Sequence, residues 1–145
     1  MKTASFLIAL LFAGVAFGGD FFEVDGVALR GFDVVSYHDG TPKKGDAAHA
    51  SVYKGSKFLF ASDQSRRAFE AAPEKYAPQF GGFCALGTAN GYKVSTQPDA
   101  YRVVDGRLYF NYDRKVLEIW SKDTTGYIRR AEANWPEVAK SKQRD

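Results

Sequence analysis

The chain contains a single cysteine, Cys84, and this limits how its fold can be held together. One cysteine cannot form an intrachain disulfide, so the stability of the folded chain must come from a packed core. Phenylalanine, tyrosine and tryptophan make up 15% of the 145 residues, which supplies bulky apolar side chains for a small domain. Cys84 itself is left as a buried thiol, an intermolecular cross-link or a ligand, and the sequence leaves these alternatives open.

The first residues have the features of an export signal. Lys2 gives a basic start, an apolar segment follows, and Ala16-Phe17-Gly18 offers small residues at both positions that a signal peptidase reads. The apolar segment is shorter than the roughly 20 residues that a transmembrane helix needs. We therefore expect a signal peptide over residues 1–18, with cleavage after Ala16 or an uncleaved anchor as alternatives.

Removal of the signal leaves residues 19–145, a length that suits a single domain. This domain is expected to be periplasmic or secreted, with no membrane span after cleavage. The full chain carries a net charge of +3, and its basic residues are dispersed in pairs such as Lys43-Lys44 and Arg66-Arg67. Such pairs are typical of a solvated surface, so we expect no nucleic-acid partner.

The pattern of the mature chain predicts an α+β fold, with small antiparallel hairpins packed against several short helices. The clearest hairpin joins 101–104 to 107–110 through Asp105-Gly106, which suits a tight type I′ turn, and a second is expected over 51–60. The runs 22–29 and 32–37 are short and rich in apolar residues, and the second is expected to be a strand that ends before His38. Helices are expected after Ser62 or Asp63, over 83–90, after Asp113 and from about Thr125, with Trp135-Pro136 following the last one.

Several motifs resemble the YHS domain family. They are Asp33-Val34-Val35-Ser36-Tyr37, His49, the segment from Tyr53 to Ser62, and Pro73-Glu74-Lys75-Tyr76. Later motifs, around Gly81-Gly82-Phe83-Cys84, Val104 to Tyr112 and Ala133 to Pro136, are similar to a longer, exported branch of that family. The resemblance spans nearly the whole mature chain and implies heavy-metal association through cysteine ligands.

The chain departs from the family at those cysteines. Ser36 stands where metal-binding relatives carry one cysteine, and Ala61 and Ser65 stand where they carry two more. A serine hydroxyl is a poor substitute for a thiolate toward Cu(I) or Zn(II). The cysteine cluster that the resemblance implies is therefore missing.

The remaining candidate metal ligands are His49, Cys84 and His38. Imidazole and thiolate ligands suit copper or another transition metal, although the spacing of the three matches no recognised metal signature. Cys84 is expected in the first turn of a helix, where the helix dipole stabilises the thiolate form of its side chain. Each of the three also has a purely structural interpretation. His38 would be a surface histidine in a turn at a strand end, His49 an interior histidine, and Cys84 a buried thiol.

These observations favour a non-catalytic, exported binding domain. The expected partner is a transition metal, copper first, or a small ligand, in metal handling or as an accessory factor. A thiol-dependent enzyme or redox protein using Cys84 is one alternative, and a protein-interaction module is another.

Overall fold

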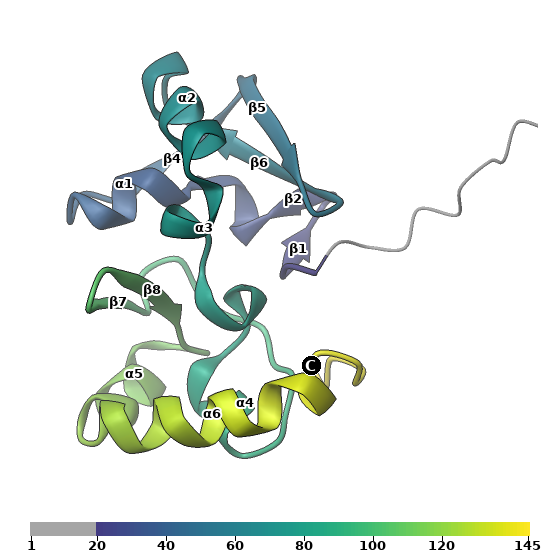
Figure 1. Ribbon diagram of the computed structural model, residues 1–145, viewed down its shortest axis with the longest axis vertical. Helices are drawn as coiled ribbons and strands as arrows, with labels where there is room; N and C mark the ends of the chain where they lie inside the picture. The colour runs from purple at the N-terminus through teal and green to yellow at the C-terminus, as the bar shows by residue number, and fades with distance from the viewer. Residues whose placement is uncertain (1–19) are drawn as a thin grey trace, which may run out of the picture.

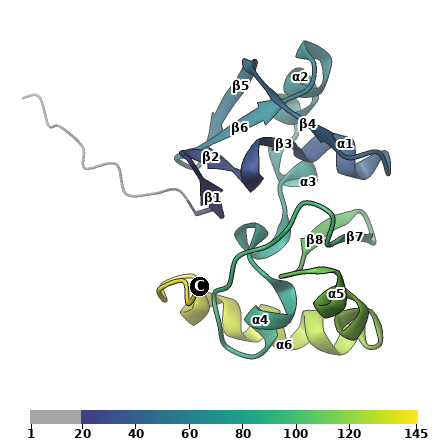
Figure 2. The ribbon, with the colours of Figure 1, turned by 180° about the vertical axis from the view of Figure 1, so that it is seen from behind.

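The computed structural model describes residues 20–145, so the expected export signal lies outside the described residues. The α+β prediction is confirmed: the described chain forms four two-stranded antiparallel sheets and six α-helices (Figures 1 and 2). The elements fall into an upper half, residues 20–77, and a lower half, residues 78–145, which the chain connects once after α3. No helix within 20–145 is both long and apolar enough to cross a membrane.

The upper half holds six of the strands and three of the helices. Its strands form three hairpin-like pairs, β1 with β2, β3 with β4 and β5 with β6. The elements are β1 (Glu23–Val24), β2 (Val27–Ala28), the 3-10 turn η1 (Leu29–Gly31), β3 (Phe32–Asp33), α1 (Val34–His38), β4 (Lys43–Lys44), β5 (Asp46–Tyr53), β6 (Ser56–Phe60), α2 (Asp63–Ala71) and α3 (Pro73–Tyr76).

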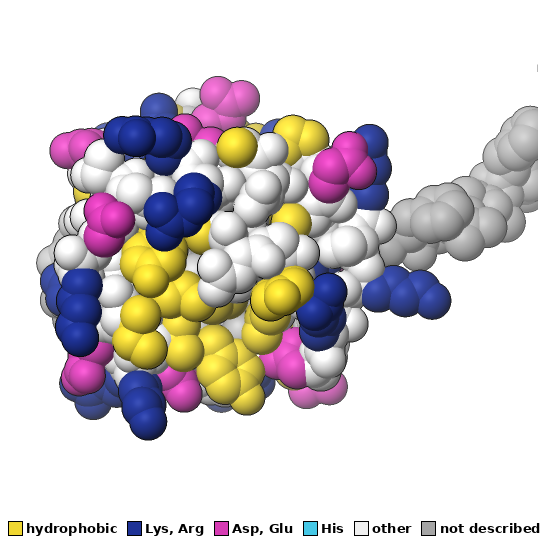
Figure 3. Space-filling view, turned by 90° about the horizontal axis from the view of Figure 1, so that it is seen from below, with side chains coloured by type: hydrophobic (Ala, Val, Ile, Leu, Met, Phe, Trp, Pro, Cys, Tyr) yellow, Lys and Arg dark blue, Asp and Glu magenta, His cyan; other side chains and the backbone are white. Residues whose placement is uncertain are grey.

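The lower half holds one hairpin and the remaining helices. Its elements are η2 (Gln79–Gly82), α4 (Ala85–Ala89), β7 (Tyr101–Val104), β8 (Arg107–Phe110), α5 (Arg114–Ser121) and α6 (Thr124–Val138). Figure 3 views this end from below and shows apolar side chains gathered among lysine, arginine and acidic ones.

The local signals for turns and helix caps are confirmed. The 101–110 hairpin pairs Tyr101 with Phe110 and turns at Asp105-Gly106, where both φ angles are positive. The Asp113 carboxylate accepts a hydrogen bond from the Val116 amide and begins α5, and the Ser62 hydroxyl caps α2 in the same way. The 51–60 hairpin is also present, with its first strand extended back to Asp46.

Two expectations about elements are wrong. Residues 34–38 form helix α1 and not a strand, because the Asp33 carboxylate accepts the amide N–H groups of Val35 and Ser36 and so caps a helix. The last helix runs through Pro136 to Val138, where a proline was expected to follow its end. Pro136 removes a single N–H near the helix end, and the Ala139 amide still donates to Trp135.

Two hydrophobic cores meet at the junction of the halves. The upper core is rich in phenylalanine and receives Leu108 and Phe110 from β8. The lower core gathers around the fully buried Trp120. Trp135, on α6, packs against both cores, so the halves are not independently packed units.

The chain crosses itself tightly at η2. Phe80, Gly81 and Gly82 all have positive φ, and the Phe22 amide donates to the Gly81 carbonyl at 2.8 Å. A Cβ atom on Gly82 would lie 2.5 Å from a Leu29 methyl carbon, which is closer than real contacts allow. The two glycines therefore serve a close backbone crossing.

Candidate functional site

The three positions at which the family resemblance implies cysteines come together in space around one buried carboxylate, that of Asp33. Ser36 lies on α1, Ser65 lies on α2, and Ala61 lies between β6 and α2. The Asp33 side chain is 1% exposed. The fold thus brings these three positions together, and none of them carries a side chain that binds a soft metal well.

Four donors satisfy the Asp33 carboxylate. One oxygen, Oδ1, accepts from the amides of Val35 at 2.9 Å and Ser36 at 3.4 Å. The other, Oδ2, accepts from the Ala61 amide at 3.0 Å and the Ser65 hydroxyl at 2.6 Å. A buried carboxylate with this many donors is stabilised without a metal ion. The arrangement ties α1 to the start of α2.

The Ser36 hydroxyl extends the same network. It donates to the Asp33 carbonyl at 2.6 Å and accepts from the Lys43 amide at 2.8 Å. Both the donor and an acceptor site of this hydroxyl are therefore used inside the protein. Ser36 acts here as a structural bridge to β4.

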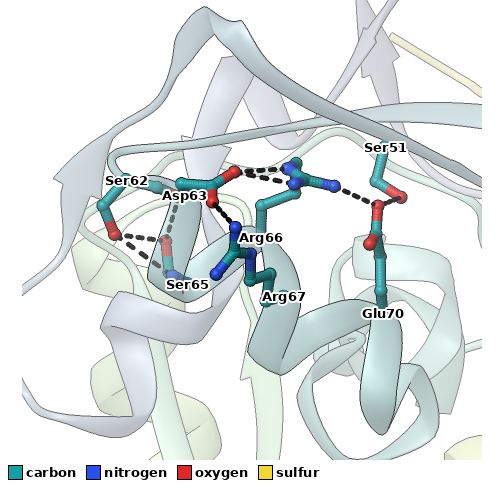
Figure 4. Close-up of polar contacts among 7 residues, drawn as sticks. All are labelled: Ser51, Ser62, Asp63, Ser65, Arg66, Arg67 and Glu70. Atoms are coloured by element: carbon teal, nitrogen blue, oxygen red, sulfur yellow. Dashed lines mark hydrogen bonds and ion pairs between the residues drawn. The ribbon is translucent and has the colours of Figure 1, made fainter.

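Outward from this network, α2 presents a ladder of ion pairs (Figure 4). Arg66 contacts Asp63 at 2.7 Å and Glu70 at 2.9 Å, and Ser51 of β5 donates to Glu70 at 3.0 Å. The hydrogen bond from Arg66 lowers the pKa of Asp63. These contacts lie one turn apart on a solvated helix face and account for the Arg66-Arg67 pair as a helix-stabilising feature.

His49 lies near this ladder. It is half-buried on β5 and close enough to Asp63 to contribute to the lowered pKa of that carboxyl. His38, in contrast, ends α1 and packs edge-to-face against Tyr76, with ring centroids 5.2 Å apart. Burial lowers the pKa of His38, and its buried Nε2 has no hydrogen-bond partner within residues 20–145.

Cys84 lies in the lower half as the N-cap of α4, one residue before the helix and not in its first turn. The side chain is 2% exposed. Its sulfur accepts from the Gly87 amide at 3.3 Å and donates to Asn111 Oδ1 at 3.6 Å. Burial raises the pKa of the thiol, so desolvation outweighs the expected stabilisation of a thiolate by the helix.

The structure does not bring the three candidate ligands together. Within residues 20–145, no group of three His, Cys, Asp or Glu side chains is placed to hold a metal ion. His38 packs against Tyr76 of α3, and His49 lies on β5, both in the upper half. Cys84 lies in the lower half, hydrogen-bonded to Asn111.

A cleft opens where the upper half meets the lower half, and sequence reasoning did not find it. We call it the central cleft; its volume is about 570 Å³. It is lined by Asp20, Phe21, Tyr53, Lys54, Glu74, Ala77, Pro78, Gln79, Phe80, Gly81, Lys93, Trp135 and Ala139. These residues come from five separated stretches of chain, which is why no local pattern pointed to them.

The walls of the central cleft combine aromatic rings with charges. Trp135 lies against Phe80, with centroids 5.9 Å apart, and Tyr53 stacks obliquely on Phe21 at the same centroid distance. Phe80 has a positive φ of 53°, an uncommon backbone conformation for a bulky residue. Backbone strain of this kind is found preferentially at functional sites.

Of the four charged residues that line the cleft, Lys93 alone is half-buried. Its ammonium donates to the Ala139 carbonyl at 2.7 Å and lies 4.8 Å from the centre of the Phe83 ring. Burial lowers the pKa of Lys93, although the nearby Asp20 carboxylate opposes this effect. Lys93 forms no ion pair with any carboxylate of the described chain.

Comparison with known proteins supports one assignment. No curated protein and no solved structure shows significant similarity to this chain. Residues 34–80 match the YHS domain, a stretch that begins at α1, contains Ser36, Ala61 and Ser65, and ends at Phe80 in η2. The chain therefore contains a YHS domain over residues 34–80.

Proposed function

We propose that this protein is a non-catalytic binding domain that takes a small organic ligand in the central cleft. The observation that carries the proposal is the cleft itself, whose volume of about 570 Å³ lies within the range typical of small-molecule sites. Its lining combines aromatic rings, which offer apolar contact area, with charged and amide side chains, which can orient a ligand.

The position of the cleft supports this role. Its lining includes Tyr53 and Glu74 from the upper half and Trp135 and Ala139 from the lower half. Sites between packed units are common places for small ligands, because two surfaces can enclose the ligand from opposite sides.

A metal-binding role has weaker support from the geometry. The positions that would carry cysteines in metal-binding relatives instead form a satisfied hydrogen-bond network around Asp33. His49 and Cys84 lie in different halves, and Cys84 has Asn111 and Gly87 as its hydrogen-bond partners.

A thiol enzyme is also disfavoured by the surroundings of Cys84. A reactive cysteine needs a lowered pKa and access to substrate. Cys84 is 2% exposed, burial raises the pKa of its thiol, and no histidine is among its hydrogen-bond partners. The structural role of Cys84 as the cap of α4 accounts for its position without a catalytic function.

The proposal can be tested by titrating ¹⁵N-labelled protein with 2-naphthalenemethanol, a neutral aromatic probe. The chain has two tryptophans, and their indole N–H signals report on different places. Trp135 lines the central cleft, whereas Trp120 is fully buried in the lower core. We expect the Trp135 signal to shift with saturation while the Trp120 signal stays in place; a Trp120→Phe variant assigns the two signals.

Two variants of matched chemistry locate the site. Ala139→Phe places a ring in the cleft and is expected to weaken probe binding at least roughly tenfold by filling it. Ala133→Phe places the same ring on the exposed side of α6, outside the cleft lining, and is expected to leave binding unchanged. Absence of any saturable shift at Trp135, or equal binding by both variants, would contradict the proposal.

A further inference from the structure

We propose that the ligand of the central cleft is an amphipathic organic anion, whose apolar ring lies on the aromatic wall and whose carboxylate or similar group binds the ammonium of Lys93. This inference rests on the proposed function, because it names the class of ligand that the same cleft would take. It goes beyond that function by assigning a role to one cation and a sign to the ligand charge.

The first support is the difference in solvent exposure among the charged side chains that line the cleft. Four charged side chains line the cleft, and Asp20, Lys54 and Glu74 are exposed at its margin. Lys93 is half-buried in the wall. An exposed charge is screened by water and salt, so the buried charge contributes most to the selection of a ligand.

The second support is that Lys93 forms no ion pair within residues 20–145. An ammonium has three N–H donors, and Lys93 uses one on the Ala139 carbonyl. Its other close partner is the face of the Phe83 ring, and no ion pair with a described carboxylate forms. A partly desolvated ammonium with free donors gains a charge-assisted hydrogen bond when a ligand anion arrives.

The third support is that aromatic side chains lie beside the Lys93 ammonium. Phe83, under the Lys93 ammonium, is within reach of Trp135, with ring centroids 6.4 Å apart. Trp135 in turn packs on Phe80. A planar apolar body lying along Trp135 would therefore place an attached anionic group toward Lys93.

The acidic residues of the cleft lining would oppose the binding of an anion. Asp20 is close enough to Lys93 to raise the pKa of its ammonium, and Glu74 lines the same opening. Both carboxylates are exposed, so water can screen their repulsion of a bound anion. If they controlled selection instead, the cleft would favour a cation, and the experiment distinguishes the two cases.

The test compares three probes with the same ring by isothermal titration of the folded chain: 2-naphthoate, 2-naphthalenemethanol and 2-naphthylmethylammonium. We expect 2-naphthoate to bind wild type at least roughly tenfold tighter than the neutral alcohol, because a charge-assisted hydrogen bond is stronger than a neutral one. Lys93→Met is expected to abolish this preference, so that 2-naphthoate and the alcohol bind this variant with similar affinity. Lys93→Arg is expected to retain it.

Lys57→Met is the matched control, because Lys57 is exposed on β6 and is not part of the cleft lining. It should bind all three probes as wild type does. Equal binding of 2-naphthoate and the alcohol to wild type would overturn the anion inference and leave the proposed function standing. Tightest binding of the ammonium probe would overturn it in favour of Asp20 and Glu74, and failure of all three probes would overturn both proposals. If Lys93→Met does not fold, the relative affinities of wild type for the three probes still test the anion inference.

Discussion

Asp33 joins two helices of the upper half through hydrogen bonds to its side chain. Its carboxylate is buried, caps α1 and receives donors from the Ala61 amide and the Ser65 hydroxyl. The chain thus holds α1 to the start of α2 with hydrogen bonds at the place where cysteines are expected in metal-binding relatives. A polar network of this kind is stable only while every member is paired.

Asp33→Ala should therefore destabilise the domain by about 3 kcal/mol, since it removes a helix cap and leaves buried donors without an acceptor. Asp113→Ala is the control, because Asp113 caps α5 through a single bond to the Val116 amide; about 1 kcal/mol is expected there. Urea unfolding of both variants measures the difference. Similar losses for the two would show that Asp33 is an ordinary cap.

Cys84 gives a prediction about pH. Burial raises the pKa of its thiol above the ordinary value of 9.0, so the folded state prefers the protonated form. The stabilisation is fully present below that ordinary pKa and is lost as the pH rises through the folded pKa. Burial also raises the pKa of Tyr37 and Tyr109, so part of the alkaline loss does not depend on Cys84.

Urea unfolding from about pH 8 to about pH 10.5 should show wild type losing stability more steeply than Cys84→Ala, which has no thiol to ionise. The variant is expected to be less stable than wild type near pH 8, because it loses the cap of α4. A constant stability difference across this range would contradict a buried, neutral thiol.

At the scale of elements, the tight crossing at η2 determines how the two halves meet. Gly81 has a positive φ of 62°, and a Cβ atom there would collide with the Asp20 carbonyl oxygen. Gly106 also has a positive φ, of 75°, in the turn of the β7–β8 hairpin, but a Cβ atom there would meet nothing within 4 Å. Substituting each glycine in turn therefore distinguishes the cost of backbone conformation, which both positions share, from the cost of steric crowding, which only Gly81 has.

Gly81→Ala is expected to destabilise the domain by about 2–4 kcal/mol, because backbone strain and a collision with main chain act together. Gly106→Ala should cost about 1 kcal/mol from conformation alone. Thermal unfolding of the pair measures the gap between them. Equal losses would mean that the crossing relaxes without resistance.

The elements also show what the sequence could predict. Asp113 as a cap and Asp105-Gly106 as a turn are local signals, and both are confirmed because neighbouring backbone groups determine them. Helix α1 was missed because the apolar run 32–37 resembles a strand, and the Asp33 cap decided otherwise. The central cleft was missed because Tyr53 and Trp135 are far apart in sequence and meet only in the folded chain.

At the scale of the whole molecule, the YHS domain over 34–80 covers 47 of the 126 described residues, with β1 to β3 before it and most of the lower half after it. The remainder adds α4 to α6 and the β7–β8 hairpin, and it supplies Lys93, Trp135 and Ala139 to the cleft. The proposed binding site therefore depends on residues inside and outside the matched domain. A fragment ending at Phe80 would lack one wall of the cleft.

Native mass spectrometry of the protein purified from its natural host tests the central claim most directly. We predict a chain that has lost residues 1–18 and carries a small organic molecule, with the adduct retained by Ala133→Phe and lost from Ala139→Phe. If Lys93 selects the ligand as proposed, the adduct should also be an acid. A metal ion bound without any organic adduct, or an organic adduct that Ala139→Phe retains, would contradict binding in the central cleft.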